Sequence, residues 1–102
     1  MKKVITTVAL VLSTNAFAEV TQEEMALCKN VQDNAEAIME GRQMEMPIVD
    51  WYEFANGNKF YMKVIDDAYD LYPMQLPENQ AKQIREFGNK WFRVCYKQQD
   101  KS

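Results

Sequence analysis

The chain has 102 residues and carries 12 lysines and arginines against 15 aspartates and glutamates, a formal net charge of −3. It contains no histidine and only two cysteines, which excludes histidine-based acid–base chemistry and histidine metal sites. This length suits one small domain, and an acidic chain of this kind is not expected to bind nucleic acid.

The first 18 residues predict a signal peptide. Two lysines form a short cationic start, the apolar run "VITTVALVL" follows, and Ala16 and Ala18 occupy the small-residue positions before a cleavage site. The alternative is a cytosolic protein with an apolar N-terminus. We expect export to the periplasm or secretion, with residues 19–102 as a single helical domain that has no transmembrane segment. Loss of the two lysines leaves a charge of 10 minus 15, or −5.

Residues 21–43 predict the first helix. Thr21 and Glu24 have the spacing of a capping box, in which each side chain accepts a hydrogen bond from the other residue's backbone N–H. Pro47 marks a boundary beyond this helix, because proline cannot continue a helix without losing a hydrogen bond. Gly41 weakens the last turn. The apolar residues at helical spacing are Cys28, Val31, Ala35, Ile38 and Met39.

The segment 47–62 allows two interpretations. Asn56-Gly57 between aromatic runs is a signal for a β-hairpin. We favour two helices, one from about Pro47 to Ala55 and one ending near Leu71, because the apolar residues after "NGN" follow helical spacing rather than alternation. Those residues are Tyr61, Val64, Ile65, Ala68, Leu71 and Tyr72.

A last helix is predicted to begin at Pro77, which suits a first helical position. Cys28 and Cys95 fall in the first and last helices, and such a pair normally forms a disulfide in an oxidising compartment. The sequence therefore predicts an all-α domain of three to four helices, with one disulfide that links its first and last helices. The expected inner seam of the last helix is Ala81, Ile84, Gly88, Trp91 and Cys95.

Five segments of the mature part carry a resemblance: Cys28, "AEAIMEGRQ" at 35–43, Met46-Pro47, "DDAYDLYP" at 66–73 and "FGNKWFRVC" at 87–95. They resemble a loose group of small exported two-cysteine helical proteins of bacteria and prophages, uncharacterised in activity. The likeness covers nearly the whole mature chain, and it implies a helical fold but no activity, cofactor or site. Members tend to have a glycine shortly after the Arg-Gln pair, where this chain has Met44 and Glu45.

Enzyme chemistry has little support, and we expect no catalytic residues, metal or cofactor. The densest remaining group of candidate acids fits no calcium-binding loop and is explained by a solvated helix face; it consists of Asp66, Asp67 and Asp70. Thioethers can bind copper(I) in an exported protein, although flexible core packing is the simpler account of the cluster Met39, Met44 and Met46.

Aromatic residues crowd the segment 51–61, more than one short helix can bury on a single face. We expect some of them to bind a partner, with Asp50 and Glu53 as a polar rim; the alternative is that they simply form the core. Arg42 is expected to cap carbonyls or to hold one of these two acids. The candidate partner-binding residues are Trp51, Tyr52, Phe54, Phe60 and Tyr61.

By elimination, the sequence predicts a non-enzymatic exported protein that binds another cell-envelope macromolecule, as an inhibitor, a stress factor or a prophage-encoded modifier. The alternative is a small-ligand or metal carrier in the periplasm, with a pocket among the aromatic residues or the methionines. An envelope hydrolase that uses carboxylates is the third and least favoured class. The sequence assigns neither the identity of a partner nor an oligomeric state.

Overall fold

The structure is a computed structural model that describes residues 20–99. This part of the chain contains four helices and no strand: α2 (Gln22–Gln43), α3 (Ile48–Ala55), α4 (Lys59–Tyr69) and α5 (Pro77–Gln99). The predicted all-α fold is confirmed, and residues 51–62 form a helix–turn–helix rather than a hairpin. The predicted signal peptide, residues 1–18, and its cleavage site lie outside the described residues.

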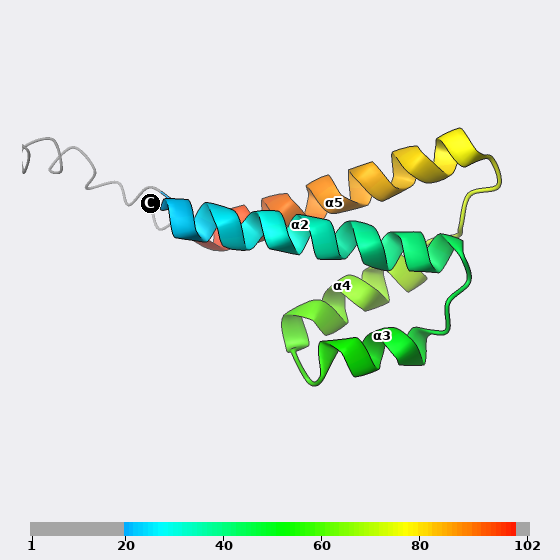
Figure 1. The fold of residues 1–102 in the computed structure, drawn as a ribbon, viewed down its shortest axis with the longest axis horizontal. Coiled ribbons are helices and arrows are strands. Elements are labelled where there is room, and N and C mark those ends of the chain that lie inside the picture. Colours follow the sequence, from blue (N-terminus) through cyan, green and yellow to red (C-terminus); the bar gives the residue numbers. More distant parts are fainter. Residues whose placement is uncertain (1–19, 100–102) are drawn as a thin grey trace, which may run out of the picture.

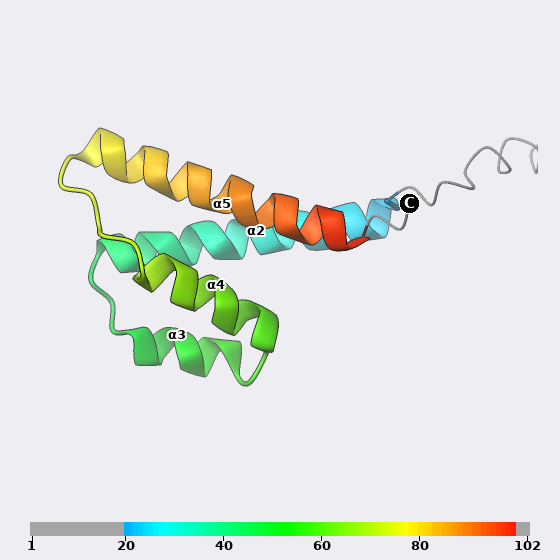
Figure 2. The ribbon, with the colours of Figure 1, turned by 180° about the vertical axis from the view of Figure 1, so that it is seen from behind.

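The two long helices, α2 and α5, run antiparallel along each other (Figure 1). They are close together near the start of α2 and splay apart toward the loop that precedes α5. The short helices α3 and α4 form a hairpin beside the C-terminal half of α2, with α4 between α2 and α3, as the view from behind also shows (Figure 2). The α2–α3 loop and the α4–α5 loop therefore lie at the same end of the molecule, which we call the loop end.

Side-chain caps explain where the helices begin and end. The predicted capping box is present: the Thr21 N–H donates to Glu24 Oε1 at 2.9 Å, and the Glu24 N–H donates to Thr21 Oγ1 at 3.0 Å. Asn56 ends α3 in the left-handed conformation, with a φ of 49°. Asn58 Oδ1 then accepts from the Tyr61 N–H at 3.0 Å and caps α4.

The predicted disulfide joins Cys28 of α2 to Cys95 of α5 across a Cα–Cα distance of 5.4 Å. Close helix contact continues at Gly88, where an added β-carbon would come within 2.5 Å of Cγ of Glu36. The predicted seam of α5 is wrong at Ala81, which is exposed. Toward its N-terminal end, α5 diverges from α2 (Figure 1). Phe87, which the predicted seam omitted, is buried.

One hydrophobic core joins the four helices. No polar or charged side chain in the described part of the chain is fully buried, so the interior is held together by apolar contacts and the disulfide. The buried apolar residues are Cys28, Val31, Ala35, Ile38, Met39, Ala55, Val64, Ile65, Ala68, Phe87, Trp91 and Cys95.

Candidate functional site

Four of the five aromatic residues that the sequence singled out form a continuous row of edge-to-face contacts; Tyr52 is not part of it. Ring centroids are 5.6 Å apart for Trp51 and Phe54, 6.0 Å for Phe54 and Tyr61, and 5.6 Å for Tyr61 and Phe60. Phe60 then contacts Trp91 of α5 at 5.6 Å. Edge-to-face pairs of this kind add to the stabilisation from burial. The row therefore links α3, α4 and α5.

Three members of this row lie between helices and are only partly accessible. Trp51 packs over Gly41 of α2, Tyr61 accepts a hydrogen bond from Asn34 Nδ2 at 2.9 Å, and Phe60 packs against the core. Their visible role is to hold the helical hairpin on α2. Binding of a partner by these three residues stays a prediction.

Three apolar side chains of α3 are accessible. Phe54 is 50% exposed, and Tyr52 and Val49 are exposed as well. The carboxylates of Asp50 and Glu53 are also exposed, as the expected polar rim requires. Two of the aromatic residues that the sequence selected, Tyr52 and Phe54, are therefore accessible, although they project to opposite flanks of α3. With Val49 they are the exposed apolar residues of α3, and we call these three the α3 face.

The three clustered aspartates have different structural roles. Asp66 accepts a hydrogen bond from the Tyr52 hydroxyl, and this bond, with desolvation and the negative charges of Asp66 and Asp70, raises the pKa of Tyr52. Asp67 Oδ2 accepts from Lys90 Nζ at 2.7 Å and from Trp91 Nε1 at 2.9 Å. Within residues 20–99, no group of three acidic or cysteine side chains is arranged to hold a metal ion.

The three clustered methionines are also divided among environments. Met39 lies in the core, where Gln43 Nε2 donates to its sulfur at 3.5 Å. Met44 is 72% exposed at the end of α2, and Met46 is half-buried in the following loop. Of these three methionines, only Met39 packs in the core, which was the simpler of the two interpretations of the cluster.

Arg42 supports the far end of α4. Its Nε donates to the Leu71 carbonyl at 3.0 Å, and its guanidinium lies 5.1 Å from the centre of the Tyr69 ring. Arg42 therefore caps a carbonyl, as predicted, but the carbonyl belongs to Leu71, which follows α4, and not to the end of α2. Among the described residues, Arg42 pairs with neither Asp50 nor Glu53.

A second apolar surface lies in the loop 70–76, which sequence reasoning had not selected as a site. The predicted apolar stripe is wrong at Leu71 and Tyr72, because α4 ends at Tyr69 and both residues are exposed in the loop that follows. Tyr72 is 87% exposed and Leu76 is 53% exposed, and their neighbours Leu71 and Met74 are exposed too. We call these four residues the apolar loop surface. Its signal was available in "LYPMQLP", where four large apolar residues are interrupted by prolines and so cannot share one buried helix face.

The backbone of this loop is held by glutamine side chains from two helices. The Met74 N–H donates to Oε1 of Gln43 at 2.8 Å, and the Met74 carbonyl accepts from Gln80 Nε2 at 2.9 Å. Gln83 Nε2 donates to the Tyr72 carbonyl at 3.3 Å, and Gln83 also bonds to Gln43. The exposed apolar side chains are therefore presented on a fixed backbone.

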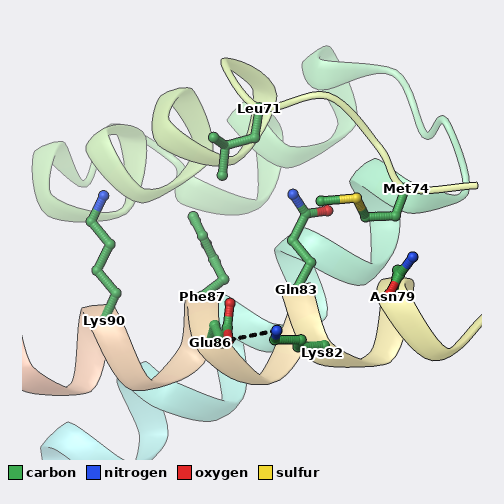
Figure 3. Close-up of a pocket in the computed structure, with 8 residues that line it drawn as sticks. All are labelled: Leu71, Met74, Asn79, Lys82, Gln83, Glu86, Phe87 and Lys90. Atoms are coloured by element: carbon green, nitrogen blue, oxygen red, sulfur yellow. Dashed lines mark ion pairs between the residues drawn. The ribbon is translucent and has the colours of Figure 1, made fainter.

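A groove of about 500 Å³ adjoins the apolar loop surface (Figure 3). Phe87 and Gln83 rise from α5 toward Leu71 and Met74, which form the opposite side. The charges at its rim are compensated, because Lys82 pairs with Glu86 at 4.0 Å and Lys90 pairs with Asp67 at 2.7 Å. The groove is therefore suited to an uncharged, largely apolar group. Its lining residues are Leu71, Met74, Asn79, Lys82, Gln83, Glu86, Phe87 and Lys90.

None of the described helices is both long enough and apolar enough to cross a membrane. Comparison of the chain with protein-family models, curated proteins and solved structures finds no match. The candidate site is accordingly defined by its geometry: the apolar loop surface with its groove, and the α3 face.

Proposed function

We propose that this is a non-enzymatic exported protein that binds another protein of the cell envelope, and that the partner contacts the apolar loop surface. The observation that carries the proposal is the exposure of Tyr72 and Leu76 on a loop whose backbone is fixed by hydrogen bonds. Several exposed apolar side chains close together in the sequence of a small domain favour an interaction site, and a loop that is already ordered loses little entropy on binding.

The groove supplies what an interface of this kind needs at its centre. An apolar side chain of the partner can enter the groove between Phe87 and Leu71, where it would be removed from water. Tyr72 and Leu76 would then contact the partner's residues on either side of that side chain. Aromatic and aliphatic anchors in such pockets contribute most of the binding energy in protein interfaces, and surrounding contacts exclude water. The compensated charges at the rim avoid the desolvation of an unpaired ion.

Site-specific photocrosslinking tests the proposal. A photoreactive phenylalanine analogue at Tyr72 should crosslink one envelope protein in living cells, whereas the same analogue at Lys29, an exposed residue of α2, should not. The pair Tyr72→Ala and Leu76→Ala should weaken the isolated complex by about a hundredfold, because each substitution removes a side chain at the contact. Circular dichroism checks that this variant stays folded.

The alternative location is the α3 face, and the same method distinguishes it. Crosslinks from Phe54 without crosslinks from Tyr72 would move the contact to the aromatic residues that the sequence selected. Absence of a specific product at both positions would contradict the binding function. Export is tested separately, by intact mass of the periplasmic or secreted protein, which is expected to begin at Glu19.

A further inference from the structure

A second groove, separate from the loop end, lies between the first turns of α4 and the C-terminal half of α5. Its volume is about 500 Å³. Phe60, Trp91 and Val94 supply its apolar side, and Lys59, Lys63 and Gln98 supply its polar side. The proposed protein partner does not involve this groove.

The apolar side of this groove is held in place. Trp91 is only 8% exposed, its indole N–H donates to Asp67 Oδ2 at 2.9 Å, and its ring packs edge-to-face on Phe60. Both rings are thus fixed from behind by α4 and the core. A ligand would meet a preformed apolar wall rather than one that must first be ordered.

The polar side carries positive charge that the protein does not compensate. Lys59 and Lys63 are four residues apart on α4, so their side chains share one face of the helix, and both are exposed. Within residues 20–99 neither forms an ion pair, whereas Lys82 and Lys90 of the other groove each have a carboxylate partner. Two free cations therefore border an apolar groove on a protein that is acidic as a whole.

We propose that this groove binds a free single-chain amphiphilic anion, a carboxylate or phosphate monoester on an aliphatic chain. The anionic group lies between Lys59 and Lys63, and the chain lies along Phe60, Trp91 and Val94. This second binding function goes beyond the proposed protein partner and does not depend on it.

The dimensions favour a small amphiphile over larger occupants. A volume of about 500 Å³ falls within the range of small-molecule sites. A partner helix would need apolar anchors over several turns, and three apolar side chains are too few for that. Insertion into a bilayer needs protruding apolar side chains, whereas Trp91 is almost wholly covered.

Decanoate and decyl phosphate, used below their micellar concentrations, are suitable probes for the oxidised, exported protein. Calorimetry should show one bound anion per chain, and tryptophan emission should shift because Trp91 lines the groove. The uncharged 1-decanol has the same chain and should bind about tenfold more weakly, since it cannot pair with the lysines. A decanol affinity equal to that of decanoate would overturn the proposal.

The pair Lys59→Gln and Lys63→Gln should lower the affinity for decanoate by about tenfold while circular dichroism stays unchanged. The matched pair Lys29→Gln and Lys82→Gln makes the same change in net charge away from this groove, and should alter the affinity by less than about twofold. Equal losses in the two pairs would show nonspecific attraction and refute the site. Sedimentation with phosphatidylglycerol vesicles, without binding of monomeric decanoate, would also refute it and indicate a bilayer surface instead.

Discussion

Gly41 and Trp51 are in direct contact: a β-carbon added at Gly41 would stand 2.7 Å from Nε1 of Trp51. The buried glycine thus leaves room for the indole, and this contact seats α3 against the end of α2. The fit has a cost, because among the described residues Nε1 has no hydrogen-bond acceptor, although the Tyr69 hydroxyl lies nearby. Gly41 therefore acts in packing, a role that the sequence pattern did not indicate.

The substitution Gly41→Ala is expected to lower the free energy of unfolding by about 1 to 2 kcal/mol. Alanine gains about 1 kcal/mol in helix propensity over glycine, but displacing the packed indole of Trp51 to relieve the overpacking costs more. Urea unfolding followed by circular dichroism measures the difference. Near-ultraviolet dichroism should change as well, because Trp51 must move.

Gly88→Ala is the matched control for Gly41→Ala. A β-carbon there would also be too close, at 2.5 Å, but the atom it meets is Cγ of Glu36, whose half-buried side chain can rotate toward water. We expect a loss of stability clearly smaller than that of Gly41→Ala. Equal losses would mean that the indole of Trp51 is no harder to move than a surface glutamate.

The disulfide between Cys28 and Cys95 joins the long helices α2 and α5 away from the loop end, and its contribution to stability can be tested. Cys28 and Cys95 are 67 residues apart in sequence, and both are buried. Replacing both with alanine should lower the free energy of unfolding by about 4 kcal/mol, since the open chain gains conformational entropy when it unfolds. Denaturant titration of the double variant measures this loss.

Reduction of the wild type supplies the control for the cysteine variant. The folded protein should resist reductant, because its sulfurs are covered, and should lose the same stability once it is reduced in denaturant and refolded. A double variant as stable as the oxidised wild type would show that the disulfide does not stabilise the fold.

Asp67 is the acid with the largest structural role in α4. It accepts hydrogen bonds from Lys90 Nζ and from the partly buried Nε1 of Trp91. Asp67→Ala should lower the free energy of unfolding by about 2 kcal/mol, because the indole N–H loses its acceptor. Lys90→Ala should cost less than about 1 kcal/mol, since that lysine is largely exposed. If thermal unfolding showed equal losses for Asp67→Ala and Lys90→Ala, the stabilising interaction would be the ion pair of Asp67 with Lys90 and not its hydrogen bond with Trp91.

Local sequence signals were sufficient for the helices and the disulfide. The capping box at Thr21 acts within a few residues and was predicted from them, and the apolar spacing after "NGN" favoured a helix although Asn56-Gly57 also allowed a hairpin. Ala81 was placed wrongly for the opposite reason. Its exposure depends on how α5 packs against the other helices, and no local pattern encodes that packing.

The candidate site was only partly accessible to sequence reasoning. The crowding of rings in 51–61 correctly indicated that they could not all share one buried face, but which of them is exposed depends on how α3 sits on α4. Phe54 is exposed and Trp51 is not, although they are three residues apart. The loop surface at Tyr72 is fixed by Gln43 and Gln83, which come from distant helices and carry no local signal.

Tyr69 makes stability sensitive to alkaline pH. Burial raises the pKa of Tyr69 above the ordinary 10.0, against a smaller opposing effect of the Arg42 guanidinium. A pKa that is higher in the folded state favours the neutral form there, so this stabilisation is present below pH 10 and is lost as the pH rises through the folded pKa. The free energy of unfolding is therefore expected to fall above pH 10.

Tyr69→Phe tests this dependence. At neutral pH the variant should lose about 1 kcal/mol, because the Met46 carbonyl loses the hydroxyl that donates to it, and its alkaline decline should be shallower. Tyr72→Phe is the control. Because the Tyr72 ring is mostly in water, this substitution should change neither the stability at neutral pH nor its decline at alkaline pH. Denaturant unfolding curves measured across the alkaline range give the free energy of unfolding at each pH. If this free energy declined as steeply in Tyr69→Phe as in the wild type, the prediction would be contradicted.

The turn after α2 contains a strained residue whose replacement should stabilise the protein. Glu45 has a φ of 62°, its N–H donates to the Arg42 carbonyl at 3.0 Å, and the Met46 N–H donates to the Gly41 carbonyl at 2.9 Å. This is the Schellman arrangement at a helix end, in which glycine normally occupies the left-handed position.

Glu45→Gly should raise the free energy of unfolding by about 1 kcal/mol, because glycine adopts a positive φ without steric cost and a carboxylate leaves the negative end of α2. Asn56→Gly should change it little, since asparagine tolerates the left-handed conformation. Glu45→Gln removes the charge but keeps the strained backbone, so it should raise the free energy of unfolding by only a minor part of the increase expected for Glu45→Gly. A gain in Glu45→Gln equal to that in Glu45→Gly would assign the effect to charge alone and leave the backbone of this turn unstrained.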